Sequence, residues 1–359
     1  MIFIEGMMSK VNVVKFAGAY IAFIIGSGFA TGQEIMQFFT SNGLWSMGSI
    51  IISLVLFTYY GSIIMGSGYD YKNSKNHSAY KYFCGKSLGT FYELFIPIIL
   101  FTSVVIMISG SGATLNEYYG LNYYIGCAFM SVLVLISYIF GLEKLINIVG
   151  FIGPVIVFFS LMVGFIIIFQ NLDGLKHINL IINNLEVKNA SGGWIKSGII
   201  YAAYNLVGGV IFFTTLGKTA NCRKEAVYGG ALGSMVLMFV ILVMNLALLS
   251  KIGDVYELSI PTLYFAKSIS PILGKVFSVV LLCGIFSTAA PNFWTVCTKV
   301  SKDEGAGSKF IAVFISIAAC LCGLFPFEKL VGSIYPYTGF FGILLFICIL
   351  VKQISKRII

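Results

Sequence analysis

The triplet Gly26-Ser27-Gly28 interrupts an apolar run that extends from about residue 12 to residue 39. The hydrocarbon of a bilayer does not hydrogen-bond to exposed N–H and C=O groups, so a spanning helix loosened here needs other partners for its backbone. Such groups persist only where they line a cavity within the protein or hold a ligand. The triplet therefore predicts a binding site at mid-membrane.

The two helix ends at this break have opposite polarity. A half-helix that starts just after Gly28 directs free N–H groups and a positive dipole end into the cavity, which suits a carboxylate. The half-helix that ends before Gly26 presents unpaired carbonyl groups, which suit a cation. The break thus offers what an ion-coupled carrier of a zwitterion needs, with Phe29 as part of an apolar wall.

A second interruption is expected in a later apolar run at residues 205–209, with the sequence Asn-Leu-Val-Gly-Gly. Asn205 would serve as side-chain donor and acceptor, and Tyr201 or Tyr204 as an aromatic wall. The alternative for Asn205 is a hydrogen bond between helices that involves no ligand. The residues expected to contact the solute are Gly26, Ser27, Gly28, Phe29, Tyr204, Asn205, Val207, Gly208 and Gly209.

A pair of hydroxyl groups at Ser287 and Thr288 shares one helical face with Gly284. Sodium is a hard cation that prefers oxygen ligands, and neutral hydroxyls beside carbonyl groups coordinate it without trapping it. Pro291 lacks the N–H that would bond to the carbonyl of Ser287, which frees that oxygen. The alternative is that both hydroxyls bond to carbonyls of their own helix.

Glu34 is the acid that falls well inside a spanning segment, beyond Gly28. Acidic side chains within a membrane are costly and usually functional. Three roles remain open: a lid over the outer vestibule, a proton carrier, or the partner of a cationic group of the solute. Its place toward the outer half favours the lid, with Lys329 or Lys196 as partner. A structural alternative pairs Glu34 with neighbouring backbone N–H groups.

Long apolar segments carry these residues. Hydrophobic residues make up 58% of the 359 residues, charged residues make up 10%, and the mean hydropathy is +0.94. A helical crossing needs roughly 20 apolar residues, and the chain has ten such blocks, near residues 12–39, 44–65, 91–116, 121–140, 145–170, 195–216, 226–250, 273–298, 310–324 and 330–351. The sequence predicts an all-α integral membrane protein, a single transmembrane domain over residues 1–359 embedded in a lipid bilayer.

The net charge of +9 is explained by topology, so nucleic-acid binding is not expected. If both termini are cytoplasmic, most Lys and Arg residues fall on the cytoplasmic side, as the positive-inside rule requires. This predicts a multi-pass protein of the plasma membrane. The two histidines, His77 and His177, have no metal-ligating cluster near them, and the eight cysteines show no CxxC spacing. Neither a transition-metal site nor an enzyme active site is expected.

Two landmarks indicate an internal repeat. The sequence Glu-Lys-Leu at residues 143–145 recurs 185 residues later at 328–330, and Gly26 falls on Gly208 at an offset of 182. Because five helices is an odd number, the second half enters the membrane from the opposite side. The two halves, about 12–170 and 195–351, are expected to form an inverted repeat in which helices 1 and 6 are broken at mid-membrane.

Ten helices with two broken ones in a 5+5 inverted repeat resemble the LeuT-fold transporters of the amino acid, polyamine and organocation superfamily. The run from Gly26 to Glu34, Gly-Ser-Gly-Phe-Ala-Thr-Gly-Gln-Glu, looks most like the YkvI-type bacterial membrane proteins. The resemblance implies a sodium site between helices 1 and 8. Its ligands would be the carbonyls of Ala22, Ile25 and Gly284 and the hydroxyls of Ser287 and Thr288.

The predicted function is secondary active transport, as sodium-coupled symport of a small amino acid or similar zwitterionic solute by alternating access. The resemblance implies that helices 1, 2, 6 and 7 rock against 3, 4, 8 and 9, and that residues 259–267 form a short helix over the vestibule. Proton-coupled transport or exchange is the first alternative. A transporter-like sensor that binds without transport is the second. The solute's identity and the oligomeric state are left open.

Overall fold

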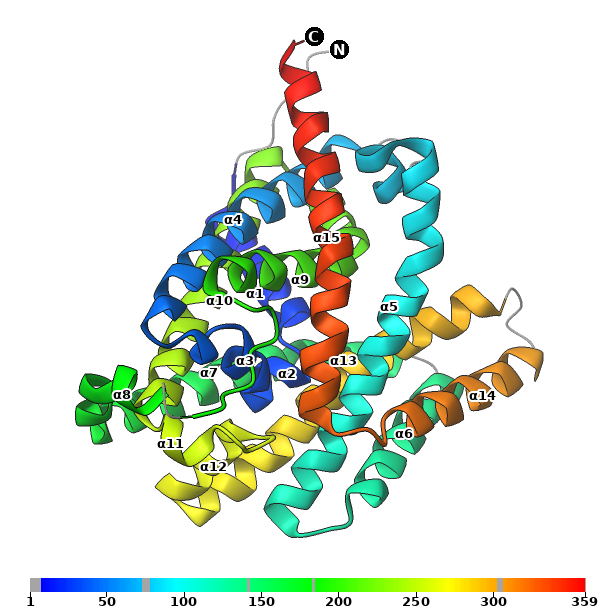
Figure 1. The fold of residues 1–359 in the computed structure, drawn as a ribbon. Helices are drawn as coiled ribbons and strands as arrows, with labels where there is room; N and C mark the ends of the chain where they lie inside the picture. Colours follow the sequence, from blue (N-terminus) through cyan, green and yellow to red (C-terminus); the bar gives the residue numbers. More distant parts are fainter. Residues whose placement is uncertain (1–7, 73–77, 141–142, 183–184, 302–305, 359) are drawn as a thin grey trace.

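Helices build the structure, a computed structural model that describes residues 8–72, 78–140, 143–182, 185–301 and 306–358 (Figure 1). In chain order they are α1 (Lys10–Ile24), α2 (Ser27–Thr31), α3 (Gln33–Phe38), η1 (Thr40–Trp45), α4 (Ser46–Asp70), α5 (Ala79–Tyr119), α6 (Tyr123–Phe140), α7 (Glu143–Gln170), η2 (Leu172–His177), α8 (Ile178–Ile182), α9 (Trp194–Lys218), α10 (Arg223–Ser250), α11 (Ile252–Val255), α12 (Pro261–Ile269), α13 (Pro271–Val300), α14 (Ala306–Cys322) and α15 (Phe327–Ile358). No strand occurs within the described ranges, and the all-α prediction is confirmed.

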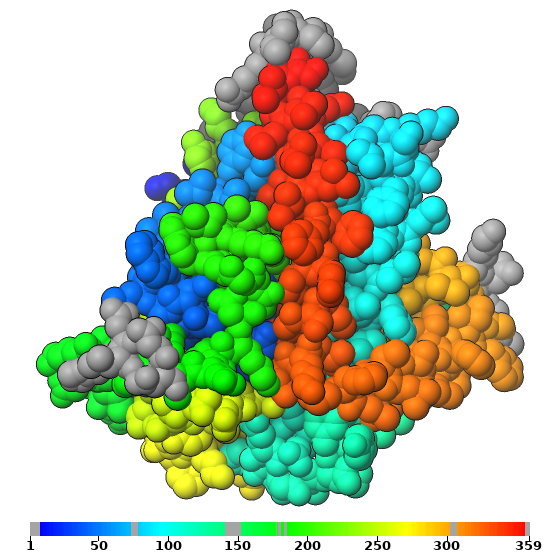
Figure 2. Space-filling model, in the orientation of Figure 1, coloured from blue at the N-terminus to red at the C-terminus, as the bar shows by residue number. Residues whose placement is uncertain are grey.

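Ten segments correspond to the ten predicted spans. In the described part of the chain, eight helices are long and apolar enough to cross a membrane: α4, α5, α6, α7, α9, α10, α13 and α15. The shorter apolar helix α14 is the ninth segment, and the first span is divided among α1, α2 and α3. Figure 2 shows α15 as a continuous column on one face of the molecule.

The spans pack in two groups. The first, called the bundle, consists of α1, α4, α9 and α10, and the second, called the scaffold, consists of α5, α6, α13 and α14. Two helices connect the groups, because α7 contacts α10 and α13, and α15 contacts α9 and α5. The short helix α2 leaves the bundle and packs on α5 and α13. Helix 1 therefore touches both groups at its break.

A symmetric contact between α6 and α14 supports the inverted repeat. Ser131 Oγ donates to the carbonyl of Ser316 over 3.0 Å, and Ser316 Oγ donates to the carbonyl of Ser131 over 3.2 Å. The two residues are 185 positions apart, which is the spacing of the two Glu-Lys-Leu segments. Residues that contact their own repeat equivalents lie at the pseudo-twofold axis. The side chains of Glu143 and Lys144, the first of those segments, lie outside the described residues.

The predicted break in helix 6 is wrong, because α9 is one helix that runs through residues 205–209. Gly208 and Gly209 adopt no positive φ, and glycine alone does not open a helix whose hydrogen bonds are intact. A Cβ on Gly209 would lie 2.4 Å from the ring of Phe213 and 2.8 Å from the ring of Phe23. This glycine gives room to aromatic side chains, so it serves helix packing.

Close contact within the bundle also depends on glycine. A Cβ on Gly217 of α9 would lie 2.0 Å from the carbonyl oxygen of Met65 in α4, and a Cβ on Gly68 of α4 would lie 2.1 Å from the carbonyl oxygen of Thr214. These neighbours are backbone atoms, which do not move aside as the tip of a side chain does. The two helices therefore touch backbone to backbone, as small residues allow in membranes.

Gly217→Ala is expected to lower the unfolding temperature of the purified protein, because the new methyl group forces α4 and α9 apart at a cost of about 1–3 kcal/mol. Gly208→Ala is the matched control in the same helix, since no atom lies within 4 Å of its Cβ position. It should leave stability unchanged or raise it by up to about 1 kcal/mol, because alanine favours an unbroken helix. Thermal unfolding followed by circular dichroism measures both, and a loss at Gly208 equal to that at Gly217 would contradict the continuous α9.

Candidate functional site

Helix 1 opens between α1 and α2, as predicted. α1 ends at Ile24, Ile25 and Gly26 have extended backbone angles, and α2 begins at Ser27. Among the backbone hydrogen bonds of the described residues, none reaches the carbonyl oxygens of Ala22 or Ile25. These oxygens form the free, electronegative end of α1.

A second bend in helix 1 turns Glu34 back onto the break. Gly32 has φ +83°, in the left-handed region that favours glycine, and it separates α2 from α3. Glu34 lies in the first turn of α3, and its Oε1 is 2.1 Å from the point where a Cβ on Gly28 would lie. The second glycine of the triplet therefore makes room for a carboxylate that belongs to the protein itself.

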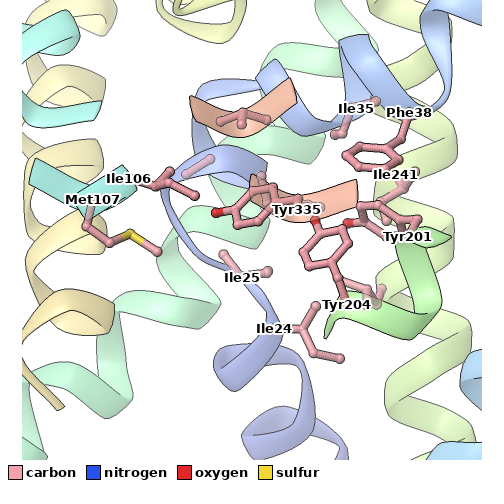
Figure 3. Packing of buried hydrophobic residues seen from close by; sticks show 14 of the residues in the cluster. Ile24, Ile25, Ile35, Phe38, Ile106, Met107, Tyr201, Tyr204, Ile241 and Tyr335 are labelled. Atoms are coloured by element: carbon pink, nitrogen blue, oxygen red, sulfur yellow. The ribbon is translucent and has the colours of Figure 1, made fainter. Parts of the chain in front are cut away.

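A cavity of about 1140 Å³ reaches this break and is lined by helices of both groups and by α7 and α15. The predicted site residues that line it are Ala22, Ile25, Gly26, Glu34, Tyr204, Asn205, Gly208, Ser287 and Thr288. Figure 3 shows Ile25, Tyr204 and Tyr335 close together at the break, with Met107 of α5 on the other side. The structure thus brings together the break, one face of α9 and the hydroxyl pair of α13.

Other predicted residues do not line the cavity: Ser27, Gly28, Phe29, Val207, Gly209 and Gly284. Ser27 and Phe29 are buried in the protein. Tyr80 Oη donates to the carbonyl of Val207 over 2.6 Å, and Asn205 Nδ2 donates to the carbonyl of Tyr201 one turn earlier over 3.0 Å. Because α9 is unbroken, it offers side chains to the cavity and no free helix ends.

Tyrosines surround Glu34. Tyr204 Oη donates to Glu34 Oε2 over 2.7 Å, and the ring of Tyr335 stacks on that of Tyr204 with 4.5 Å between centroids. Glu34 is only 3% exposed and forms no salt bridge with any residue that the structure describes. Lys196, one of the two expected partners, instead lies over the ring of Phe340. The carboxylate is therefore held without a neighbouring positive charge.

Tyr335 is a site residue that the sequence reasoning missed. It precedes Pro336 within α15, and Pro154 lies within α7, its repeat equivalent. A proline inside a helix leaves a carbonyl of the preceding turn without its donor, which marks irregular backbone. Tyr335 and Pro154 both line the cavity. The paired prolines were the available signal.

The hydroxyl pair of α13 bonds to its own helix, as the alternative prediction describes. Ser287 Oγ donates to the carbonyl of Gly284 over 2.8 Å, and Thr288 Oγ1 lies 3.4 Å from the same oxygen. The Gly284 carbonyl is therefore engaged. Both hydroxyl oxygens still keep lone pairs and line the cavity together with Ala22 and Ile25. Two hydroxyls and two unpaired carbonyls make an oxygen-only donor set that fits a hard cation.

Helix α5 carries the repeat equivalent of this hydroxyl pair. Thr102 and Ser103 lie 185 residues before Ser287 and Thr288, and both line the cavity. Thr102 Oγ1 donates to the carbonyl of Ile99 over 2.8 Å, as Ser287 does to Gly284. By the repeat, free carbonyls beside Thr102 and Ser103 would have to come from α9, which has no break. In the described residues, hydroxyls and free helix-end carbonyls therefore occur together in one half of the repeat.

Helix α12 packs on α2, the part of helix 1 that follows the break. It begins with Pro261 in its first turn, and the expectation of a short helix here is confirmed. Thr262 Oγ1 donates to the carbonyl of Ala30 in α2 over 2.7 Å. The carboxylate of Glu117 accepts hydrogen bonds from the N–H groups of Ser259 over 2.7 Å and Ile260 over 3.0 Å. These contacts tie α12 to helix 1 and to α5.

The cavity is open at one end. Its lining includes the exposed residues Lys15, in the first turns of α1, and Lys299, near the end of α13, and the half-buried Lys218 at the end of α9. Figure 1 shows the two chain termini on one side of the molecule and α12 on the opposite side. The cavity therefore opens toward the side of the termini, and its positive charges lie at the mouth.

Two relatives match almost the whole chain, whereas no family model matches. The chain is 24% identical over 358 residues to the membrane protein YkvI of Bacillus subtilis (strain 168), which covers 97% of this chain and 98% of the relative. It is 22% identical over 334 residues to YyaD of the same organism, with 93% and 95% covered. The resemblance to the YkvI-type proteins is confirmed.

Solved transporter structures have the same architecture. MhsT, in complex with L-phenylalanine, matches with a TM-score of 0.63 and 12% identity over 94% of this chain and 89% of its own. Mhp1, a nucleobase-cation-symport-1 family transporter with bromovinylhydantoin bound, matches with a TM-score of 0.57 and 13% identity over 89% and 74%. The chain has the LeuT fold. A manganese transporter of Eremococcus coleocola also matches, with a TM-score of 0.56 and 13% identity over 98% and 81%.

Within the LeuT fold, α1, α2 and α3 together are helix 1, α9 is helix 6, α13 is helix 8 and α15 is helix 10. These neighbours are transporters, and what this chain shares with them at 12–13% identity is the fold. The candidate site therefore lies where helices 1, 6, 8 and 10 of the LeuT fold meet.

Tyr204→Phe is expected to lower stability by about 1–3 kcal/mol, because it removes the hydrogen bond to the buried Glu34 carboxylate. Tyr201→Phe is the matched control one turn away, since the Tyr201 hydroxyl is buried without a hydrogen-bond partner among the described residues. It should be neutral or slightly stabilising. Thermal unfolding of both variants in the same detergent tests this, and a greater loss in Tyr201→Phe would show that the network is assigned wrongly.

Proposed function

We propose that the protein is a secondary active transporter that couples movement of a small organic solute, an amino acid or similar zwitterion, to sodium. The observation that carries this proposal is the cavity at the break of helix 1, which is open on the side of the termini, whereas α12 is bonded to helix 1 on the opposite side. Alternating access needs a central site that is reachable from one side at a time. With both termini in the cytoplasm of a plasma-membrane protein, this cavity faces the cytoplasm.

The walls of the cavity support a small solute that carries both polar and apolar groups. Tyr204, Tyr335 and Met107 supply apolar and aromatic surface, and Asn205 and Glu34 supply polar atoms. Ligand sites of this kind combine apolar walls with a few placed polar groups. The structures of MhsT and Mhp1 hold L-phenylalanine and bromovinylhydantoin, which are small organic molecules.

The oxygen atoms around the end of α1 support sodium as the coupled ion. The carbonyls of Ala22 and Ile25 and the hydroxyls of Ser287 and Thr288 would hold the ion between helix 1 of the bundle and helix 8 of the scaffold. An ion that draws these two groups together lowers the free energy of one conformation relative to the other, and this difference is the basis of coupling.

The two groups of helices supply the moving parts of the proposed cycle. The bundle would rock against the scaffold, with the site at the break of helix 1 between them. Opening of the outer side requires release of α12 from helix 1, which means loss of the hydrogen bond from Thr262 to Ala30. Closure of the cytoplasmic side then brings α1 and α9 toward α5 and α13 across the cavity.

Proton coupling is the second candidate, because the buried acid Glu34 lines the cavity. Uptake of labelled solute into proteoliposomes separates the candidates: a sodium gradient drives it in the first, and a pH gradient without sodium drives it in the second. Solute binding without accumulation under either gradient would indicate a sensor.

Replacement of Ser287 and Thr288 together by alanine is expected to abolish the stimulation of uptake by sodium, because it removes two of the four proposed oxygen ligands. The folded state should persist, since each hydroxyl donates within its own helix. Initial rates of uptake into proteoliposomes, measured against sodium concentration, test this.

Thr298→Ala is the matched control for the loss of a hydroxyl. Thr298 lies on the same helix, bonds to its own helix and is exposed outside the cavity lining. Its variant should keep the sodium dependence of the unmodified protein. The sodium site is refuted if the double variant still responds to sodium as the unmodified protein does.

A further inference from the structure

The Glu34 carboxylate takes the space beside the break that a carboxylate of the solute would need. Its Oε1 lies within 2.1 Å of the Cβ position of Gly28, and its Oε2 accepts the hydrogen bond from Tyr204. If the carboxylate of the solute were bound at the start of α2, the negative charge of Glu34 would repel it at short range. In addition, α2 has five residues, so its dipole is too short to offset that repulsion.

Among the described residues Glu34 forms no ion pair, and the donor bonded to its carboxylate is the neutral hydroxyl of Tyr204. The α1 carbonyls of Ala22 and Ile25 are without backbone donors, and α1 points its negative dipole end at the same cavity. The lining lysines lie at helix ends by the mouth of the cavity, where Lys15 and Lys299 are exposed and Lys218 is half-buried. A buried carboxylate in such a setting is stabilised by a cation or by a proton.

The aromatic rings at this end suit an organic cation. Tyr204 and Tyr335 stack on each other and both line the cavity, and the face of a tyrosine ring attracts ammonium groups. An ammonium group only donates hydrogen bonds. The hydroxyls, the carbonyls and the carboxylate around this part of the cavity can accept them. A carboxylate of the solute finds no donor of positive charge at this depth in the described lining.

We propose that the site recognises its solute through a cationic nitrogen, with the ammonium group bound by Glu34, the end of α1 and the rings of Tyr204 and Tyr335. This deepens the proposed function and rests on it: the substrate class is primary amines and amino acids held by their ammonium end. In a bound amino acid the carboxylate points away from Glu34, toward the mouth of the cavity. Organic acids that lack an amine are not substrates.

Matched ligand sets test this on the purified, full-length protein. One set is phenylethylamine, L-phenylalanine and phenylpropionate, and a second set is isobutylamine, L-valine and isovalerate; within each set only the charged groups differ. We expect that at least one amine and its amino acid raise the unfolding temperature, and that the acids do not. The proposal is overturned if the acids raise the unfolding temperature as much as the amines do. It is also overturned if no amine raises it.

Glu34→Gln removes the charge and keeps the shape of the side chain, so it should weaken binding of the amine at least tenfold. Glu93→Gln is the matched control, since Glu93 lines the mouth of the same cavity and pairs with Lys81, and it should change binding little. Unchanged amine affinity in Glu34→Gln would overturn the proposal. The comparison of ligands in the unmodified protein remains decisive if this variant does not fold.

Uptake of the same labelled compounds into proteoliposomes separates this inference from the function on which it rests. If the acids accumulate and the amines do not, transport stands and recognition through the ammonium group is refuted. If amines bind but none accumulates under a sodium or a pH gradient, the transport proposal fails while the recognition of the cation remains.

Discussion

Backbone groups without hydrogen-bond partners are costly within a membrane, and this fold contains them where α1 ends at Ile24. The cavity, the tyrosines of α9 and α15 and the hydroxyl pair of α13 all gather at that point. Glycine at position 28 permits the next step, because it lets the Glu34 carboxylate fold back against α2. The break in helix 1 thus accounts for the site and for the position of the Glu34 carboxylate within it.

The two halves of the repeat have diverged at this position. Helix 1 is open at Ile25 and Gly26, whereas helix 6 continues through Gly208 and uses Gly209 to accommodate aromatic rings. The hydroxyl pair exists in both halves, but only the pair that includes Ser287 lies beside unpaired carbonyls in the described chain. The proposed sites for the ion and the solute therefore lie on one side of a symmetric frame, so the pocket has a polarity that the symmetry alone does not provide.

Ten spans, their order and the break in helix 1 were predictable from the sequence, because apolar length and Gly-Ser-Gly are local signals. The continuity of helix 6 was not, since a glycine pair is compatible with both a break and close packing, and Phe23, one of the rings packed against Gly209, lies far away in the sequence. The partner of Glu34 was also missed. Its hydrogen bond to Tyr204 spans 170 positions, and no local pattern encodes such a contact.

The reciprocal contact between Ser131 and Ser316 has a geometric consequence for any movement of the protein. When two inverted halves exchange their shapes, a contact between two repeat-equivalent residues is mapped onto itself. Both serines lie in the scaffold, on α6 and α14, so the same pair of hydrogen bonds is compatible with either shape of the two halves. Probes placed near it would report no displacement while the pocket changes sides.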